Sequence, residues 1–280
     1  MYKLRDWVKI ESLTEDLCSN PKAISYLEKN PEKINWYRLS LNPEAIPILE
    51  KNQDKIKWDY LSENPAAIHL LTKNPDKINW AILSENPAAI HLLEQNPDKI
   101  NWYYLSSNPA AIHILEQNMD KVNWYMLSFN TAAVHLFEKY TKNDWYVWQG
   151  FSSNPAAIPF LEKHLGLIDW TYLCKNPAAI HILEKNMHLV DMFWLSCNPN
   201  AIHLLTKNFK KINWHWLSRV PEAIELLEAN QDKIQWDIIS ENPAIFEYDY
   251  EKMVRPFTEE LMQNRFSPKN IDKFEEWGFE

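Results

Sequence analysis

The stretch "NPAAIHLLEQNPDKINWYYLSSNPAAIHILEQN", residues 86–118, contains nearly the same segment twice. The pair Asn-Pro, or a close variant, falls at eleven positions: Asn20, Asn42, Asn64, Asn86, Asn108, Asn130, Asn154, Asn176, Asn198, Val220 and Asn242. The interval is 22 residues except between Asn130 and Asn154, where it is 24. A Trp stands six residues before most of these positions, so the unit reads W-x-x-L-S-x-N-P-x-A-I-x-x-L-x-x-N-x-x-x-I-N. A fixed period over eleven copies predicts a repeat architecture.

Each unit predicts two short helices. Asn108 is a good N-cap, and Pro109 fills the first helical position, where its missing N–H costs nothing. A helix of about ten residues follows, whose apolar side is formed by Ala111, Ile112, Ile114 and Leu115. Asn118 ends this helix, and Asn123 is the N-cap of a second one over "WYMLSF". The unit is therefore a compact helical hairpin.

Such a hairpin cannot bury its apolar face alone, so neighbouring units must stack. The expected fold is all-α, an α-solenoid of about eleven 22-residue repeats with N- and C-terminal caps. Helices packed 8 to 10 Å apart would extend roughly 90 to 110 Å along a curved path. The sequence therefore predicts an elongated stack without a central globular core.

The departures from the pattern suggest three parts. Residues 1–19 form an N-terminal cap, in which Thr14 stands where other units carry Trp. Residues 20–252 form the repeat array, with an irregular unit near 139–150 that contains Trp145 and Gly150 and is expected to kink the stack. Residues 253–280 do not repeat anything earlier and are expected to be a C-terminal helical cap docked on the last unit.

Composition excludes several classes of protein. Three glycines leave no glycine-rich loop to hold a phosphate, and the net charge of −9 opposes binding to polyanions. No 18-residue apolar run exists, and the first residues carry charges where a signal peptide would be apolar. An odd number of cysteines fits a reducing compartment. We therefore expect a soluble, non-secreted protein with neither a nucleic-acid nor a membrane partner.

The W-x-x-L-S-x-N-P-x-A-I-x-L-L units resemble tandem repeats of uncharacterised proteins from giant DNA viruses, the Mimivirus and Marseillevirus relatives. The segment "EELMQNRFSPKNIDKFEEWGFE" at the end of the chain is similar to a closing segment of such proteins. Together the two resemblances cover about residues 14–280. They imply a helical repeat protein of viral origin in the host cytoplasm or the virion, and they imply no activity and no catalytic residues.

Several recurring side chains could carry chemistry. Six histidines share one place in the longer helix: His69, His91, His113, His135, His181 and His203. Equivalent side chains in stacked units are about 10 Å apart, too far to share a zinc ion, so we expect surface histidines and no metal or other cofactor. The recurrent Lys of "DKI" is expected to form solvated ion pairs between repeats. Aromatic residues two places after the Trp interchange with Ile and Met, which favours burial over stacking on bases.

No acid–base or nucleophilic arrangement stands out, so we expect no enzyme. Cys18 and Cys174 occupy the place of the repeat Ser and are expected to be packed side chains.

The most variable places directly follow the Trp and directly precede the Asn. They are four residues apart and therefore share one face of the short helix. We expect this face to bind a protein or peptide, because aromatic residues dominate interface hot spots. The candidate binding residues are Tyr103, Ser107, Tyr125, Phe129, Thr171, Lys175, Phe193, His215 and Arg219. The expected function is a non-enzymatic interaction scaffold, and the alternative is a structural or self-assembling virion-associated protein.

Overall fold

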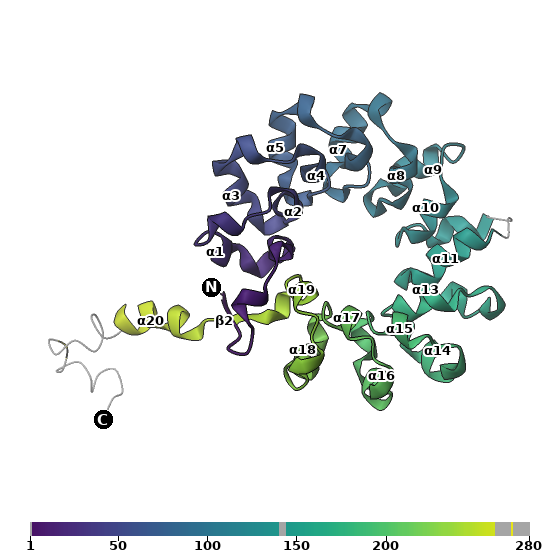
Figure 1. Cartoon of the computed structure of the whole chain (residues 1–280). Coiled ribbons are helices and arrows are strands. Elements are labelled where there is room, and N and C mark those ends of the chain that lie inside the picture. The colour runs from purple at the N-terminus through teal and green to yellow at the C-terminus, as the bar shows by residue number, and fades with distance from the viewer. Residues whose placement is uncertain (1, 140–143, 261–269, 271–280) are drawn as a thin grey trace.

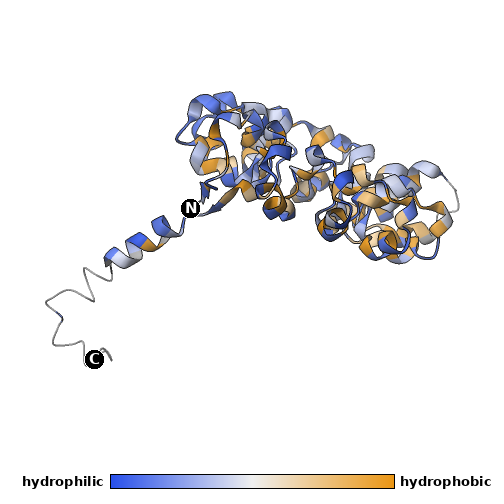
Figure 2. Cartoon of the chain, turned by 60° about the horizontal axis from the view of Figure 1, so that its bottom comes forward, coloured by the Kyte–Doolittle hydropathy of each residue, from blue (hydrophilic) through white to orange (hydrophobic). Residues whose placement is uncertain are grey.

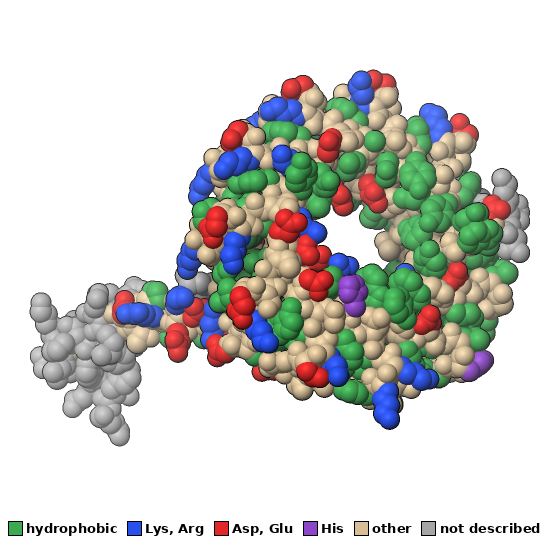
Figure 3. Space-filling model, in the orientation of Figure 1, with side chains coloured by type: hydrophobic (Ala, Val, Ile, Leu, Met, Phe, Trp, Pro, Cys, Tyr) green, Lys and Arg blue, Asp and Glu red, His purple; other side chains and the backbone are tan. Residues whose placement is uncertain are grey.

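The computed structural model describes residues 2–139, 144–260 and 270, and shows a ring of helices around a central opening (Figures 1 and 3). Two concentric layers of short helices form the ring, which confirms the all-α repeat architecture. One pair of three-residue strands joins the two ends of the array. No described helix combines the length and the apolar character needed to cross a bilayer.

The inner layer contains the short helices that begin at or near the repeat Trp (Figure 1). In the first unit their place is taken by a 3-10 turn, η2 (Glu15–Ser19). The others are α2 (Trp36–Leu41), α4 (Trp58–Leu61), α6 (Trp80–Leu83), α8 (Trp102–Ser107), α10 (Trp124–Phe129), α11 (Trp145–Ser153), α13 (Trp170–Lys175), α15 (Met192–Leu195), α17 (Trp214–Leu217) and α19 (Trp236–Ile239).

The outer layer contains α1 (Ile24–Leu27), α3 (Ile46–Lys51), α5 (Ile68–Lys73), α7 (Ile90–Gln95), α9 (Ile112–Gln117), α12 (Ile158–Leu161), α14 (Ile180–Lys185), α16 (Ile202–Lys207) and α18 (Ile224–Glu228). The Asn-Pro pair opens most of these helices through a 3-10 turn, such as η11 (Pro109–Ala111) before α9. The expected helix after Asn108 is thus confirmed, with its first turn tightened.

The buried asparagines connect each unit to the one before it. Asn108 Nδ2 donates to the carbonyl oxygens of Ser84 (3.0 Å) and Asn86 (3.1 Å), while its Oδ1 accepts from the N–H of Ala110 (3.0 Å). An amide side chain can donate and accept at once, which an aspartate or an aliphatic residue cannot do. This double role explains why Asn recurs at the start of the outer helices.

The repeat Ser makes a second link between units. Ser106 Oγ donates to the Trp102 carbonyl (2.6 Å) and accepts from the N–H of Asn123 in the next unit (2.9 Å). Cys18 replaces this Ser in the first unit, and its Sγ accepts from the N–H of Asn35 at 3.2 Å. Cys18 and Cys174 are both fully buried, as their place in the repeat predicts.

The expected elongated stack is wrong, because the first unit packs on the last and closes a ring. Asn20 Nδ2 donates to the carbonyls of Ser240 (3.2 Å) and Asn242 (3.0 Å), the same two bonds that join neighbouring units elsewhere. Eleven units complete one turn, so each must be rotated by about 33° relative to its neighbour. That rotation depends on how the helical layers pack against one another, and no single unit determines it.

The two ends are also clasped by segments outside the repeats. Strand β1 (Tyr2–Leu4) pairs antiparallel with β2 (Phe246–Tyr248), and the Arg5 N–H donates to the Ile245 carbonyl at 2.9 Å. Trp7 packs edge to face on Trp236, with ring centroids 6.3 Å apart. The residues expected to cap one end of a stack therefore close a ring instead.

The irregular unit lengthens an inner helix and leaves the asparagine link between units intact. Helix α11 begins three residues before Trp148, and a 3-10 segment, η12 (Val134–Lys139), stands where an outer helix would be. Asn154 Nδ2 still donates to the carbonyls of Ser128 (3.0 Å) and Asn130 (3.2 Å). Gly150 allows close packing there, because a Cβ atom at this residue would lie 1.7 Å from Ser128 Oγ.

Helix α20 (Tyr250–Glu260) projects from the ring next to the pair of strands β1 and β2 (Figures 1 and 2). The C-terminal cap expected at 253–280 begins within this helix. Its remaining residues, Asn270 apart, lie outside the described part of the chain.

Candidate binding surface on the inner wall of the ring

Three positions of most inner helices are exposed or half-buried on the side of the central opening. In α8 they are Tyr103, Tyr104 and Ser107, whereas Leu105 and Ser106 on the opposite side are fully buried. The three positions follow the repeat Trp by one, two and five residues and therefore lie on one helical face. We call the residues at these positions the inner wall. The variable face identified in the sequence consists of the first and third of them.

Aromatic residues cover the inner wall at α8 and α10, and Tyr146 of α11 lies beside them. Tyr103 is 44% exposed and meets Tyr104 edge to face, with ring centroids 5.3 Å apart. Tyr125 contacts Phe129 (5.2 Å) and Tyr146 (6.3 Å) in the same manner. Figure 3 shows hydrophobic side chains gathered on this side of the opening. The rings position one another and leave an apolar surface toward the opening.

A second aromatic group follows on α13, α15 and α17. Phe193, 43% exposed, packs against Trp216 of the next unit at 6.2 Å, and Trp194 lies 5.9 Å from Trp216. Lys175 Nζ lies 3.7 Å from the Trp194 ring centroid and 5.1 Å from that of Tyr172. The ammonium group is thus held by cation–π contacts. Together the two groups form what we call the aromatic arc, from α8 to α17.

Acidic residues occupy the inner wall at α4 and α6. They are Asp59, Glu63 and Glu85, and α4 lies across the opening from α17 (Figure 1). Burial raises the pKa of the Glu63 carboxyl, and the nearby Glu85 carboxylate raises it further. We call these three residues the acidic arc. Their charge attracts cations to the side of the opening that faces the aromatic residues.

Basic residues near the contact between the first and last units form ion pairs with carboxylates. Arg219 Nη2 donates to Glu241 Oε1 at 3.3 Å, and Arg38 forms ion pairs with Asp16 and Glu241. Of these contacts, only the ion pair between Arg38 of α2 and Glu241, two residues after α19, crosses the seam between the first and last units. Arg219 and Glu241 belong to neighbouring units, so their contact does not cross the seam.

The structure brings the predicted binding residues together on one concave surface. Tyr103, Phe193 and His215 are exposed, and the half-buried members are Ser107, Tyr125, Phe129, Thr171, Lys175 and Arg219. Tyr104, Trp194 and Trp216 were expected to be buried. They are half-buried and form part of the wall. Their place directly beside the variable position on a helix is the signal that could have identified them.

The histidine column lies on the outer layer and pairs with glutamates of the preceding unit. Five histidines place Nε2 2.8–3.0 Å from a Glu Oε1: His69, His113, His135, His181 and His203. The residue equivalent to these glutamates for His91 is Thr72. Within residues 2–139 and 144–260, no three His, Cys, Asp or Glu side chains are grouped as metal ligands.

The recurrent lysines do not make the expected ion pairs in most of these units. Lys55 lies over Trp36 at 4.9 Å, and the equivalent distances are 4.6 Å for Lys77 over Trp58 and 4.7 Å for Lys121 over Trp102. The indole face attracts the ammonium group while the alkyl stem covers apolar surface. This contact explains why Lys recurs 19 residues after Trp. Lys99 lies 3.7 Å from Asp98 and Lys233 lies 3.0 Å from Asp232, but each of these ion pairs forms within one turn, whereas ion pairs between repeats were expected.

The thiols are poor nucleophiles. Burial raises the pKa of Cys18 and Cys197, and it raises that of Cys174 to about 11. A reactive cysteine needs a lowered pKa so that it is a thiolate near neutral pH. These three residues therefore fit packing roles.

Comparison with protein families, curated proteins and solved structures finds no match to this chain.

Proposed function

We propose that this chain is a non-enzymatic ring scaffold that binds a slender protein segment against its inner wall. One observation carries the proposal: the inner wall of a closed ring has an aromatic arc from α8 to α17 and an acidic arc at α4 and α6. Exposed aromatic residues are the side chains that most often anchor protein interfaces.

The ring limits the size of the partner. Eleven inner segments whose axes are about 8–10 Å apart form a circle about 30 Å across. Subtracting the radius of a helix with its side chains, about 5–6 Å, on each side leaves an opening on the order of 20 Å. A single helix is about 10–12 Å across and an extended strand is narrower. A 100-residue domain, with a radius of gyration of about 13 Å, is too wide. The partner is thus an extended or helical segment.

The chemistry of the wall favours a segment with two unlike sides. Apolar or aromatic side chains of the partner would pack on the rings of Tyr103, Tyr125 and Phe193. Lys or Arg side chains would face Asp59, Glu63 and Glu85 across the opening and could also stack on aromatic faces. If the resemblance to giant-virus repeats holds, this partner is a host or viral protein met in the host cytoplasm or in the virion.

The test uses a displayed library of linear peptides selected on the folded ring. Phe193→Asp should weaken the selected peptides at least tenfold in fluorescence polarisation, because hot-spot aromatics contribute about 2 kcal/mol or more. Leu189→Asp is the matched control, since Leu189 is 42% exposed on the outer turn η15 (Met187–Leu189) and Phe193 is 43% exposed. Peptides that bind both variants equally well would contradict the proposal.

A second candidate function, self-assembly in or on a virion, is favoured by an apolar patch outside the inner wall. Three consecutive turns carry exposed apolar residues where earlier units have Pro-Asp-Lys: Leu165, Leu167, Leu189 and Phe209. Contiguous exposed apolar surface is typical of association sites. A mass in light scattering that rises with concentration, and that Leu189→Asp abolishes, would support this candidate.

A further inference from the structure

Lys175 differs from the other cations of the inner wall. The Lys and Arg residues at the inner-wall positions are Arg38, Lys175 and Arg219. Glu241 pairs with both arginines. Lys175, by contrast, forms no ion pair within the part of the chain that the structure describes, and its contacts are with aromatic rings. No described carboxylate therefore neutralises its charge.

Two aromatic rings hold the Lys175 ammonium group in place. Its Nζ lies 5.1 Å from the ring centroid of Tyr172 in its own unit and 3.7 Å from that of Trp194 in the next. The side chain is half-buried within the aromatic arc, whereas Lys55, which lies over Trp36, is exposed to water. A cation that is already oriented and partly desolvated loses less entropy when it binds an anion.

Another unit shows how the same arrangement is completed by an anion. Arg219 occupies the repeat position of Lys175 and lies 5.5 Å from the ring of Trp216 in its own unit. Its Nη2 also donates to Glu241 Oε1 at 3.3 Å, and Glu241 occupies the same repeat position one unit later. A ring contact and an ion pair therefore coexist at this position of the repeat.

In the unit that follows Lys175, a cysteine stands where that glutamate would be. Cys197 follows Lys175 by 22 residues, as Glu241 follows Arg219. Its Sγ donates to the Trp194 carbonyl at 3.0 Å. Burial raises the pKa of the Cys197 thiol, although the charge of Lys175 opposes this, so the thiol is uncharged near neutral pH. The next unit thus provides no negative charge for Lys175.

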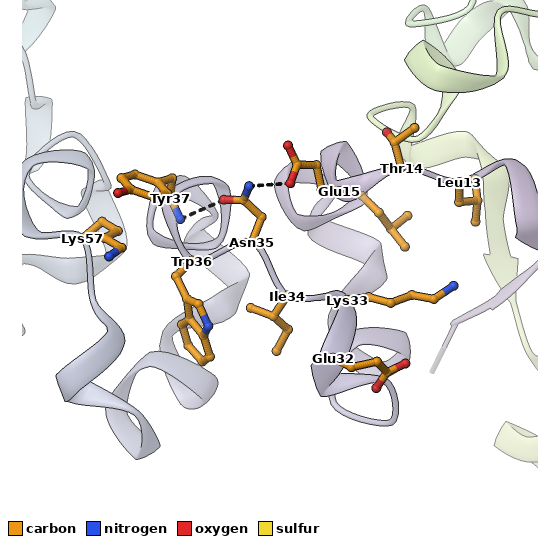
Figure 4. A pocket seen from close by; sticks show the side chains of 11 residues that line it. Leu13, Thr14, Glu15, Glu32, Lys33, Ile34, Asn35, Trp36, Tyr37 and Lys57 are labelled. Carbon is orange, nitrogen blue, oxygen red and sulfur yellow. Dashed lines mark hydrogen bonds between the residues drawn. The ribbon is translucent and has the colours of Figure 1, made fainter.

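Carboxylates elsewhere on the inner wall are engaged or distant. Glu15 Oε2 accepts from Asn35 Nδ2 at 2.8 Å beside the pocket of the first unit (Figure 4). Glu241 is shared by two arginines. The acidic arc lies at α4 and α6, and α4 is across the opening from α13 (Figure 1). A carboxylate that reaches Lys175 therefore comes from outside the described part of the chain.

We propose that Lys175 binds a carboxylate of the partner segment, an Asp or Glu side chain, in the way that Arg219 binds Glu241. This inference rests on the proposed function, because it concerns the same partner on the same wall. A single carboxylate fits better than a phosphate group, since one lysine provides no bidentate fork and the net charge of −9 opposes a dianion. The partner then presents an acidic residue to α13 and basic residues to the acidic arc.

The test sequences the peptides that the displayed library yields on the folded full-length ring. Asp and Glu should be enriched about fivefold or more at one position of the motif selected on the natural ring. Cys197→Glu provides the carboxylate from within, as Glu241 does for Arg219, and should abolish this enrichment. Cys197→Gln is the matched control, because it adds the same bulk without the charge, and the acidic preference should remain.

The outcomes separate this inference from the proposed function. Equal enrichment of Asp and Glu on the two Cys197 variants would overturn the role of Lys175 while the proposed function stands. A library that yields no peptide for the natural ring would contradict the proposed function, and this inference with it. Lys175→Gln should lose the acidic preference and Lys175→Arg should keep it; loss in both would show that Lys175 only packs between the rings.

A second measurement uses the natural protein with a selected, N-acetylated peptide and a carbodiimide. The expected product is an amide bond between Lys175 Nζ and the acidic side chain of the peptide, identified by mass spectrometry. A peptide joined only to other lysines, or a bond from Lys175 to a carboxylate of this chain in place of the peptide, would overturn the proposal.

Discussion

Replacing Asn20 with Ala tests whether the ring is closed in solution. Asn20 Nδ2 donates to the carbonyls of Ser240 and Asn242, and Oδ1 accepts from the Lys22 N–H at 3.0 Å. The first two bonds exist only when the ends of the array meet. The third is a local helix cap, present whether the ring is open or closed.

The expected loss follows from these three contacts. Each buried hydrogen bond contributes about 0.5–1.5 kcal/mol, and an Asn cap contributes about 1 kcal/mol relative to Ala. Asn20→Ala should therefore destabilise a closed ring by about 2–4 kcal/mol. In an open solenoid the amide and both carbonyls would be hydrated already, and only the cap, about 1 kcal/mol, would be lost.

The matched control is Asn42→Ala, one unit further along. Asn42 Nδ2 donates to the carbonyls of Cys18 (2.9 Å) and Asn20 (3.1 Å), and Oδ1 caps the next helix by accepting from the Glu44 N–H. Its bonds do not cross the seam, so its loss is the same for open and closed forms. Urea unfolding followed by circular dichroism gives the free energy of unfolding of each variant, and the two are compared with the same dependence on urea concentration.

Similar losses for the two variants are expected. A loss for Asn20→Ala of less than half that for Asn42→Ala would refute ring closure, because it would show that the seam bonds are absent in solution. X-ray scattering of the natural protein provides an independent check, since an open stack has a larger radius of gyration than the ring.

Two further predictions concern the inner helices. Gly150→Ala should destabilise the ring by about 1–3 kcal/mol and lower the Tm, because the new methyl group would overlap Ser128; Gly166→Ala, with no atom within 4 Å of its Cβ, should leave the Tm nearly unchanged. Because folding raises the pKa of Glu63 above its ordinary value of 4.5, the folded state favours the protonated form, so this residue's contribution to stability is lost as pH rises above that value. In urea titrations Glu63→Gln should therefore have a larger free energy of unfolding than the natural protein at pH 7, and the difference should vanish near pH 4. A difference that persists at pH 4 would contradict the raised pKa of Glu63.

Much of the candidate surface was predictable from helix geometry. Residues four apart, such as Tyr103 and Ser107, necessarily share a helical face, and variation between copies identified that face. Tyr104 and Trp216 were not predicted as surface residues, because a position that holds an aromatic residue in some copies and Ile in others is typical of a buried core. On a concave wall the same residue is half-buried by its neighbours and still borders the opening.

The sequence by itself determined the repeat unit, its two helices and the Asn and Ser residues that cap and link them. Each of these depends on interactions within about 25 residues: a cap, an apolar stripe, a side chain that reaches the preceding unit. Only the tertiary structure decided that the array closes. Closure depends on a small rotation between units summed over eleven copies, and on contacts such as Asn20 with Asn242 across 222 residues. A change of a few degrees per unit would leave every local pattern intact and separate the two ends, because angular differences accumulate around the stack while local hydrogen bonds do not.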